Sequence, residues 1–300
     1  MATAAEPLRA VLPLPGGRKG ATVKLWPLLV ATMTGPAGFF HREDGRGGRL
    51  GTLLDIVVPR ARAEVPVVAY LVEHPGAGLL LVDTGFHASV AAQPRGGMGR
   101  AGGLLFKDVR MEAGDAVPGQ LRARGIDASE VRAVVMTHLH SDHASGISQF
   151  PDATFLVSDR EWEAAGDGGP TDGYLRRQFD HAFDWRLLDF EGPDTDSFAT
   201  FGRAFDLFGD GSVRLAFTPG HSLGHLSVVL RLKGREALIA GDAVNSTRTL
   251  RDGSLPRYMA DEHLFRRSLR EIQLYAKETP DALVIPGHDL ARWRRLDPEY

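Results

Sequence analysis

The chain has 300 residues, long enough to bury one large core or two smaller ones. Its 35 basic and 38 acidic residues leave a formal charge of −3, which argues against nucleic acid or an anionic membrane as a partner and favours a small molecule. Cysteine is absent, which excludes disulfides, thiolate metal sites and a cysteine nucleophile.

The N-terminal part predicts an arm followed by one domain. Residues 1–22 are rich in Ala, Pro, Gly and Arg without an apolar period, so we expect a flexible arm, with a single domain over 23–300. Residues 24–33 are the only stretch near the N-terminus that resembles a signal sequence, but they are few, contain Pro27 and predict a core strand instead. No apolar run reaches transmembrane length, and a cytoplasmic protein is expected.

Two glycine-rich segments stand before the middle of the chain. Residues 34–51 carry Phe39, Phe40 and His41, which is typical of a loop that either packs under the core or lines a substrate site. Residues 86–111 have the composition of an insertion and could form a lid. Between them, residues 67–73 and 78–83 predict a β-hairpin.

The rest of the chain alternates between strand and helix patterns, apart from a mixed, aromatic-rich segment at 166–200. That segment suits either a helical cap near a pocket or ordinary core packing. The predicted helices cover 115–124, 158–165 and 261–277, and the predicted strands cover 131–136, 153–157, 213–217, 226–232, 235–240 and 282–285.

A cluster of metal-ligand side chains follows the strand at 131–136. His138 and His140 are two residues apart, so in extended chain both can face one ion. Asp142 and His143 come after a turn and can face elsewhere, which suggests two neighbouring metals. A polar loop or a purely structural metal site is the alternative at this point.

Three further candidate ligands each stand just past the end of a predicted strand. His221 follows 213–217, Asp242 follows 235–240 and His288 follows 282–285. Asp242 could bridge two ions, because a carboxylate has two oxygens whereas an imidazole offers one free lone pair. The recurrence of ligands at strand ends predicts one shared metal centre.

Through these seven residues and the motif Leu81-Val82-Asp83-Thr84-Gly85, the chain resembles the metallo-β-lactamase superfamily, and within it the N-acyl-homoserine lactonases. The resemblance implies an α/β fold, the αββα sandwich of two mixed β-sheets flanked by helices, although no internal repeat is visible. It also implies that Asp83 hydrogen-bonds near a metal ligand, with a buried structural carboxylate as the alternative.

The resemblance implies a division of the ligands between two divalent ions. His138, His140 and His221 would hold the first, Asp142, His143 and His288 the second, and Asp242 would bridge them. Zinc is expected, with cobalt, manganese and iron left open. The implied reaction is attack of a bridging hydroxide on a lactone, with Asp142 passing a proton to the leaving alkoxide.

Two positions depart from the lactonase pattern, and one histidine needs a role. Asn245 stands where the lactonases usually have a tyrosine that helps to hold the substrate carbonyl, so we expect its amide to serve there as a hydrogen-bond donor. Ser141 replaces an aromatic residue, which predicts a wider or wetter pocket. His225 is expected to be structural or to bond a ligand, since seven ligands already fill two sites. Surface or core placement is expected for His41, His74, His87, His181 and His263.

Several related functions stay open beside lactone opening. A general lactonase or esterase, or a glyoxalase II type of thioesterase, would use the same ligands, but only twelve residues follow His288, too few for the glutathione-binding domain of the latter. The missing cysteine disfavours a zinc β-lactamase, and the charge disfavours a nuclease. An iron-dependent oxygen enzyme and a non-catalytic metal-binding relative are further alternatives. The expected partner is a small lactone, with no nucleic acid and no membrane; a homodimer is left open.

Overall fold

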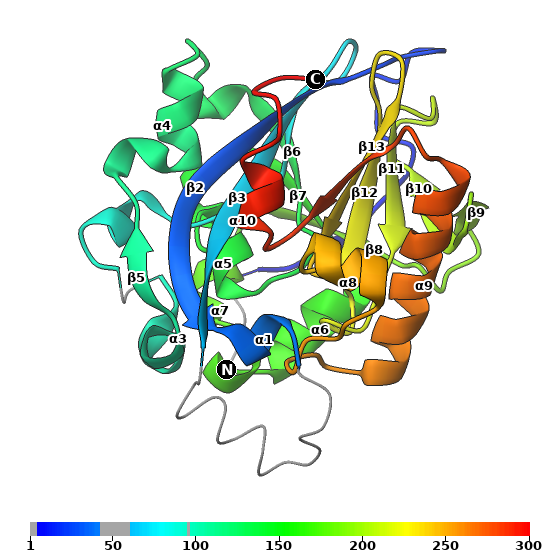
Figure 1. Ribbon diagram of the computed structural model, residues 1–300. Helices are drawn as coiled ribbons and strands as arrows, with labels where there is room; N and C mark the ends of the chain where they lie inside the picture. Colours follow the sequence, from blue (N-terminus) through cyan, green and yellow to red (C-terminus); the bar gives the residue numbers. More distant parts are fainter. Residues whose placement is uncertain (1–4, 43–60, 95–96) are drawn as a thin grey trace.

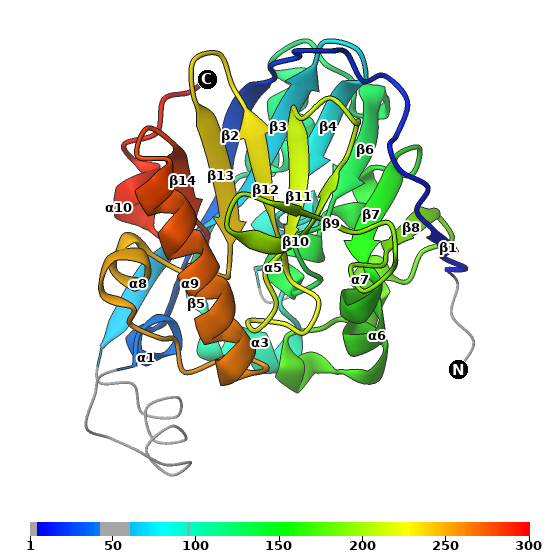
Figure 2. The same ribbon diagram turned by 90° about the vertical axis from the view of Figure 1, so that its right-hand side faces the viewer.

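The computed structural model describes residues 5–42, 61–94 and 97–300. Their strands form two sheets that pack face to face, with helices on the outer faces (Figures 1 and 2). Each sheet combines parallel and antiparallel pairs. The predicted αββα sandwich of two mixed sheets is therefore confirmed.

The first sheet has eight strands within the described residues, in the order β1-β8-β7-β6-β4-β3-β2-β5. The neighbouring pairs β1–β8, β8–β7, β7–β6 and β6–β4 are parallel. The pairs β4–β3, β3–β2 and β2–β5 are antiparallel. The strands are β1 (Leu8–Arg9), β2 (Lys24–Pro36), β3 (Arg62–His74), β4 (Gly78–Val82), β5 (Lys107–Arg110), β6 (Val131–Val135), β7 (Thr154–Ser158) and β8 (Asp184–Leu188).

The second sheet has six strands within the same part of the chain, in the order β14-β13-β12-β11-β10-β9. Only its β13–β14 pair is parallel. Its strands are β9 (Asp196–Phe198), β10 (Phe201–Asp206), β11 (Val213–Phe217), β12 (Leu226–Arg231), β13 (Glu236–Gly241) and β14 (Leu283–Pro286).

The helices lie outside the two sheets and at one end of the sandwich (Figures 1 and 2). The α-helices are α1 (Ala37–Phe40), α3 (Gly99–Leu105), α4 (Val117–Arg122), α5 (Ser141–Ala144), α6 (Asp159–Asp167), α7 (Arg176–Phe179), α8 (Thr247–Asp252), α9 (Glu262–Glu278) and α10 (Leu290–Trp293). Single 3-10 turns occur at Ala88–Ala91, Ala113–Asp115, Ala128–Glu130, Ile147–Gln149 and Pro170–Asp172. Among the described helices, none has the length and apolar character needed to cross a membrane.

Three apolar clusters account for the layered arrangement. The central cluster lies between the sheets, where Val135 of one sheet and Val228 of the other are both buried. A second cluster packs α4 and α6 on the outer face of the first sheet. The third packs Phe265 and Ile272 of α9 on the second sheet, because these residues recur at helical spacing along one face. The alternation of buried faces thus gives four layers.

The N-terminal residues make contacts that their composition does not predict. Leu8–Arg9 pairs in parallel with the edge strand β8, and the backbone N–H of Leu14 donates to the carbonyl of Leu207. The N–H of Arg18 donates to the carboxylate of Asp210. Residues 8–18 therefore bond to the edge strand β8 and to residues that follow β10, partners far away in the sequence that a local pattern cannot reveal. The flexibility of the arm 1–22 and the single domain over 23–300 stay predictions.

For the segment 166–200, the structure favours ordinary core packing over a helical cap. It contains the end of α6, the 3-10 turn Pro170–Asp172 and the one-turn helix α7, and it ends in strands β8 and β9, neither of which the sequence pattern predicts. Trp185 is buried against Phe155 in the core, so ordinary packing accounts for it. Among the aromatic residues Tyr174, Phe179, Phe183 and Trp185, Tyr174 is the one that reaches the ligand cluster, with its ring 4.9 Å from that of His140.

The two glycine-rich segments are partly described. Phe39 and Phe40 lie on α1, and residues 43–51 of the predicted loop fall outside the described residues. In the segment 86–111, helix α3 is followed by β5, which pairs with the edge of β2. Phe39 and Phe40 of the first segment and Met98 and Phe106 of the second lie beside candidate ligands. Whether 86–111 forms a lid stays a prediction.

Candidate metal centre

The candidate ligands come from four loops at one end of the sandwich. His138 and His140 follow β6, His221 follows β11, Asp242 follows β13, and His288 follows β14. Strand β6 lies inside the first sheet, whereas β11, β13 and β14 belong to the second. The loops that leave these strand ends meet over the edge of both sheets, which is how side chains up to 150 residues apart become neighbours.

The structure brings all seven predicted residues together. Their ligand atoms fall into three overlapping groups, and within each group the atoms lie within 4.8 Å of one another. The groups are His138, His140 and His221; His138, His143 and Asp242; and Asp142, His143 and His288. The first and third are the two sets that the resemblance assigns to separate ions.

Asp242 lies between the first and third groups. Its Oδ2 is 3.2 Å from Nε2 of His221 and 3.0 Å from Nε2 of His288. Its Oδ1 is 3.5 Å from Nε2 of His143. One carboxylate therefore faces imidazoles from both groups, which is the position that a bridging ligand needs.

The donor set fits divalent transition metals. Nitrogen and carboxylate oxygen are ligands that zinc accepts, and the cluster contains no thiolate. His138 Nε2 and Asp242 Oδ1 are buried polar atoms without a hydrogen-bond partner among the described residues. Because a buried polar atom without a partner costs free energy, these atoms are consistent with ligands that a cation would satisfy.

Burial sets the protonation of the first group. It lowers the pKa of His138 and His221 well below the ordinary value and that of His140 to about 4. A neutral imidazole keeps a free lone pair, so at neutral pH these three side chains can bind a metal without first losing a proton.

The second group is more strongly charged. Burial disfavours the imidazolium of His143, but the carboxylates of Asp142, Asp83 and Asp242 outweigh it and raise the pKa of His143 well above its ordinary value. Burial likewise disfavours the Asp242 carboxylate, and the imidazoles around it, led by His288, outweigh this and lower the pKa of Asp242 well below its usual range. The negative charge that collects here is what a divalent ion would neutralise.

Asp83 holds the ligand loop in place from the end of β4. Its Oδ1 accepts the backbone N–H of Thr137 at 2.7 Å, and its Oδ2 accepts the Thr137 hydroxyl at 2.7 Å. The same Oδ2 is 2.8 Å from Nδ1 of His143, which leaves Nε2 of that ring facing the cluster. Asp83 thus lies next to a candidate ligand, in the position the resemblance implies.

His225 is not part of the three groups but lies directly beneath them. Its Nε2 accepts the backbone N–H of Asp242 at 3.0 Å, so its Nδ1 carries the proton and donates to the hydroxyl of Thr218 at 2.9 Å. This contact orients the loop that carries Asp242. None of His41, His74, His87, His181 and His263 belongs to a ligand group within the described residues.

A small apolar chamber of about 220 Å³ opens beside the second group. Asp142 and Asn245 line it on the polar side, and Ser141 lies beside them. Asn245 is buried, its side-chain oxygen has no partner among the described residues, and its backbone carbonyl accepts the N–H of His288. Much of the apolar lining comes from β2, from α1, and from α3 with the residues directly before and after it: Met33, Phe39, Phe40, Met98, Leu105 and Phe106.

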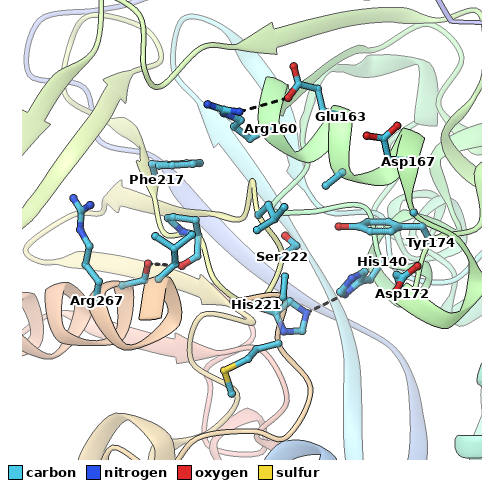
Figure 3. Close-up of a pocket in the computed structure, with 18 of the residues that line it drawn as sticks. His140, Arg160, Glu163, Asp167, Asp172, Tyr174, Phe217, His221, Ser222 and Arg267 are labelled. Carbon is cyan, nitrogen blue, oxygen red and sulfur yellow. Dashed lines mark hydrogen bonds and ion pairs between the residues drawn. The ribbon is translucent and has the colours of Figure 1, made fainter. Parts of the chain in front are cut away.

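A larger charged cleft of about 910 Å³ lies on the other side of the first group. Figure 3 shows its labelled charged side chains, among them Arg160 and Arg267, and shows His140 and His221 pointing toward each other. His140 Nδ1 and His221 Nε2 are 2.9 Å apart. These two histidines and Tyr258 line both the apolar chamber and the charged cleft, so they form the wall between them.

Sequence reasoning missed several side chains at this centre. Tyr258 stacks on Phe39 at 5.0 Å and lies 5.8 Å from the ring of His140, yet it belongs to an irregular loop without a motif. Met98 and Phe106 lie inside the segment predicted as a lid, where only their apolar character among glycines could have drawn attention to them. Glu161 is buried under the ligand loops and looks in the sequence like an ordinary helix residue.

Comparisons with known proteins agree with this geometry. A sequence profile described as the metallo-beta-lactamase superfamily matches residues 62–288. An N-acyl homoserine lactonase, AttM, of Rhizobium johnstonii is 35% identical over 243 residues, covering 79% of this chain and 88% of that protein. An N-acyl homoserine lactonase of Bacillus sp. is 28% identical over 251 residues, covering 81% and 90%.

Solved structures show the same fold. A structure of an N-acyl homoserine lactone hydrolase with the product N-hexanoyl-L-homoserine bound at the catalytic metal center has a TM-score of 0.74 at 21% identity, covering 92% of this chain and 97% of that one. AidC, described as a dizinc quorum-quenching lactonase, has a TM-score of 0.60 at 15% identity, covering 92% and 90%.

Proposed function

The chain belongs to the metallo-beta-lactamase superfamily, and from this premise we propose that it opens the lactone ring of N-acyl homoserine lactones by hydrolysis at a centre of two divalent metal ions. The observation that carries the proposal is the convergence of seven imidazole and carboxylate side chains beside an apolar chamber. The lactonases at 34–35% identity, which cover most of this chain, support the choice of substrate.

The residues fit a pair of metal ions. His138, His140 and His221 would hold one, Asp142, His143 and His288 the other, and Asp242 would face both. Two such ions, when bound, lower the pKa of water from about 15.7 toward about 7 and polarise a carbonyl oxygen. Zinc suits this donor set best, with cobalt, manganese and iron as the metals to compare.

The chain's own residues place the substrate and move a proton. Asp142 lines the chamber and retains 15% of its side-chain exposure, so its carboxyl group can reach the ring oxygen that leaves as an alkoxide and pass a proton to it. The buried amide of Asn245 can donate a hydrogen bond to a substrate carbonyl but cannot supply a proton. The apolar chamber excludes water from the acyl chain and gives it a surface to bury.

The experiment is a parallel assay of apo and metal-loaded protein. Chelator-treated protein should be inactive and should recover turnover of homoserine lactones with zinc, cobalt or manganese, with about two ions per chain by metal analysis of the same sample. Activity that persists without metal would overturn the proposal. Glutathione thioesters, aryl esters, simple γ-lactones and nitrocefin, tested beside the homoserine lactones, separate the related hydrolases. The cytoplasmic location and the homodimer stay predictions.

A further inference from the structure

A buried carboxylate lies beneath the first ligand group. Glu161 is in the first turn of α6, and none of its surface is exposed. A carboxylate removed from water is costly unless hydrogen-bond donors replace its hydration. The groups that bond to the carboxylate of Glu161 therefore indicate its role in the fold.

Four donors surround the carboxylate of Glu161, two to each oxygen. Oε1 accepts the backbone N–H of Leu139 at 2.9 Å and the phenol of Tyr174 at 3.0 Å. Oε2 accepts the hydroxyl of Ser222 at 2.5 Å and the backbone N–H of Gly224 at 3.2 Å. These contacts use all the acceptor positions of an ionised carboxylate, and no cation is among them.

The four donors belong to the segments that position one group of ligands. Leu139 stands between His138 and His140 in the sequence, and Ser222 directly follows His221. Tyr174 forms a backbone bridge with His140 and packs its ring on that imidazole. Figure 3 shows Ser222 and Tyr174 beside His221 and His140.

The close approach of α6 to the second loop is built into the chain. A Cβ at Gly224 would lie 2.0 Å from the backbone nitrogen of Glu161, so a side chain there would push the loop away from the helix. The glycine lets the backbone N–H come within reach of the carboxylate. Glu161 therefore spans two loops that come from different sheets, after β6 and after β11.

The second ligand group is held differently. His143 is oriented by Asp83, which bonds Thr137 on the other side of the ligand loop. His288 contacts the backbone carbonyl of Pro66 through Nδ1. None of the four hydrogen bonds of Glu161 involves these residues, so the loss of its carboxylate should affect one metal position more than the other.

We propose that Glu161 is a positioning residue for the first metal position: its carboxylate ties the loop of His138 and His140 to the loop of His221 and so sets the affinity of that position for its ion. The assignment rests on the metal centre of the proposed function. It adds a residue that contacts no metal ligand side chain and acts through the backbone and through Tyr174 and Ser222.

The test is the variant Glu161→Gln, with Glu163→Gln as the matched control on the exposed face of the same helix. An amide keeps the length of the side chain but places two N–H donors among the four existing donors. Apo proteins are titrated with zinc against a chromophoric chelator. We expect one of the two ions to bind about 10- to 100-fold more weakly in Glu161→Gln, with the other ion and the control unchanged.

Variants that remove a single donor keep the test decisive if Glu161→Gln does not fold. Tyr174→Phe and Ser222→Ala each delete one hydrogen bond and should weaken the same ion by a smaller factor. Unchanged affinity for both ions, or equal weakening of both, overturns the assignment while leaving the proposed function intact. Wild-type protein that takes up no metal overturns the proposed function itself, and the assignment with it.

Discussion

The apolar chamber predicts how the rate depends on the acyl chain of the substrate. Apolar side chains line the chamber, and Phe106 packs edge-on against Phe39 at 5.2 Å to form part of the wall. Each methylene buried contributes about 0.8 kcal/mol, and about 1.4 kcal/mol is a factor of ten. We therefore expect kcat/KM to rise about fourfold with each methylene that enters the chamber.

The size of the chamber limits this rise. A volume of about 220 Å³ holds about seven groups the size of a water molecule, at roughly 30 Å³ each. Chains beyond that capacity should extend into solvent and gain little, so the rise should end in a plateau. Initial rates measured with a pH indicator, over lactones with four to twelve acyl carbons, give the slope and the point where it levels off.

The variant Phe106→Ala tests whether the chamber is responsible. Removing this ring widens the wall, so the gain per methylene should fall and the plateau should move to longer chains. Phe198→Ala, on β9 and outside the chamber, serves as the control and should keep the wild-type profile. Rates independent of chain length in the wild type, or an identical profile in Phe106→Ala, would refute the reasoning.

Three further predictions concern polar side chains of the centre and one carboxylate away from it. Asp142→Ala should lower kcat by about 10²-fold or more, because both the proton donor and a candidate ligand of the second ion are lost. Asn245→Ala should lower kcat by about tenfold or less, and an equal, near-total loss for both variants in steady-state assays would contradict these roles. Asp83→Ala should weaken metal binding about 10- to 100-fold in chelator competition, because His143 loses the acceptor of its Nδ1–H. An unchanged metal affinity would show that Asp83 is only structural. Hydrogen bonds from Ser212 and Arg18, joined by His74, outweigh burial and lower the pKa of Asp210 from 3.8 to about 2. The ionised carboxylate of Asp210 therefore stabilises the folded state fully above pH 3.8, and this contribution is lost as the pH falls through about 2. In urea unfolding, Asp210→Asn should be less stable than wild type by on the order of 2 kcal/mol near neutral pH, and the difference should vanish in acid. A difference that stays constant with pH would rule this out.

Local patterns predicted much of the fold because they report which face of each element is buried. The apolar run in 131–136 and the helical spacing in 261–277 correspond to β6 and α9 within a few residues. Strands β8, β9 and β10 escaped prediction because they are short, partly exposed and follow an irregular, aromatic-rich segment. The N-terminal residues escaped for another reason, since their partner β8 is far away in sequence.

The chemistry of the centre was readable in the sequence because it depends on residue types and on strand ends. Three histidines and an aspartate within six residues, and single ligands after three later strands, are local features. The likeness to a family then implied how these residues divide between two ions. Their convergence in space follows from the order of strands in two sheets, which no local pattern contains.

The sequence by itself determined the donor atoms, the absence of thiolates and the class of reaction, because these are properties of side chains and their spacing. Only the tertiary structure decided what surrounds them. Tyr258 and Phe39 meet across 219 positions of the chain, and Glu161 collects donors from segments 22 and 61 residues away. Such contacts depend on how sheets and helices pack, and packing is a property of the whole chain rather than of any segment in it.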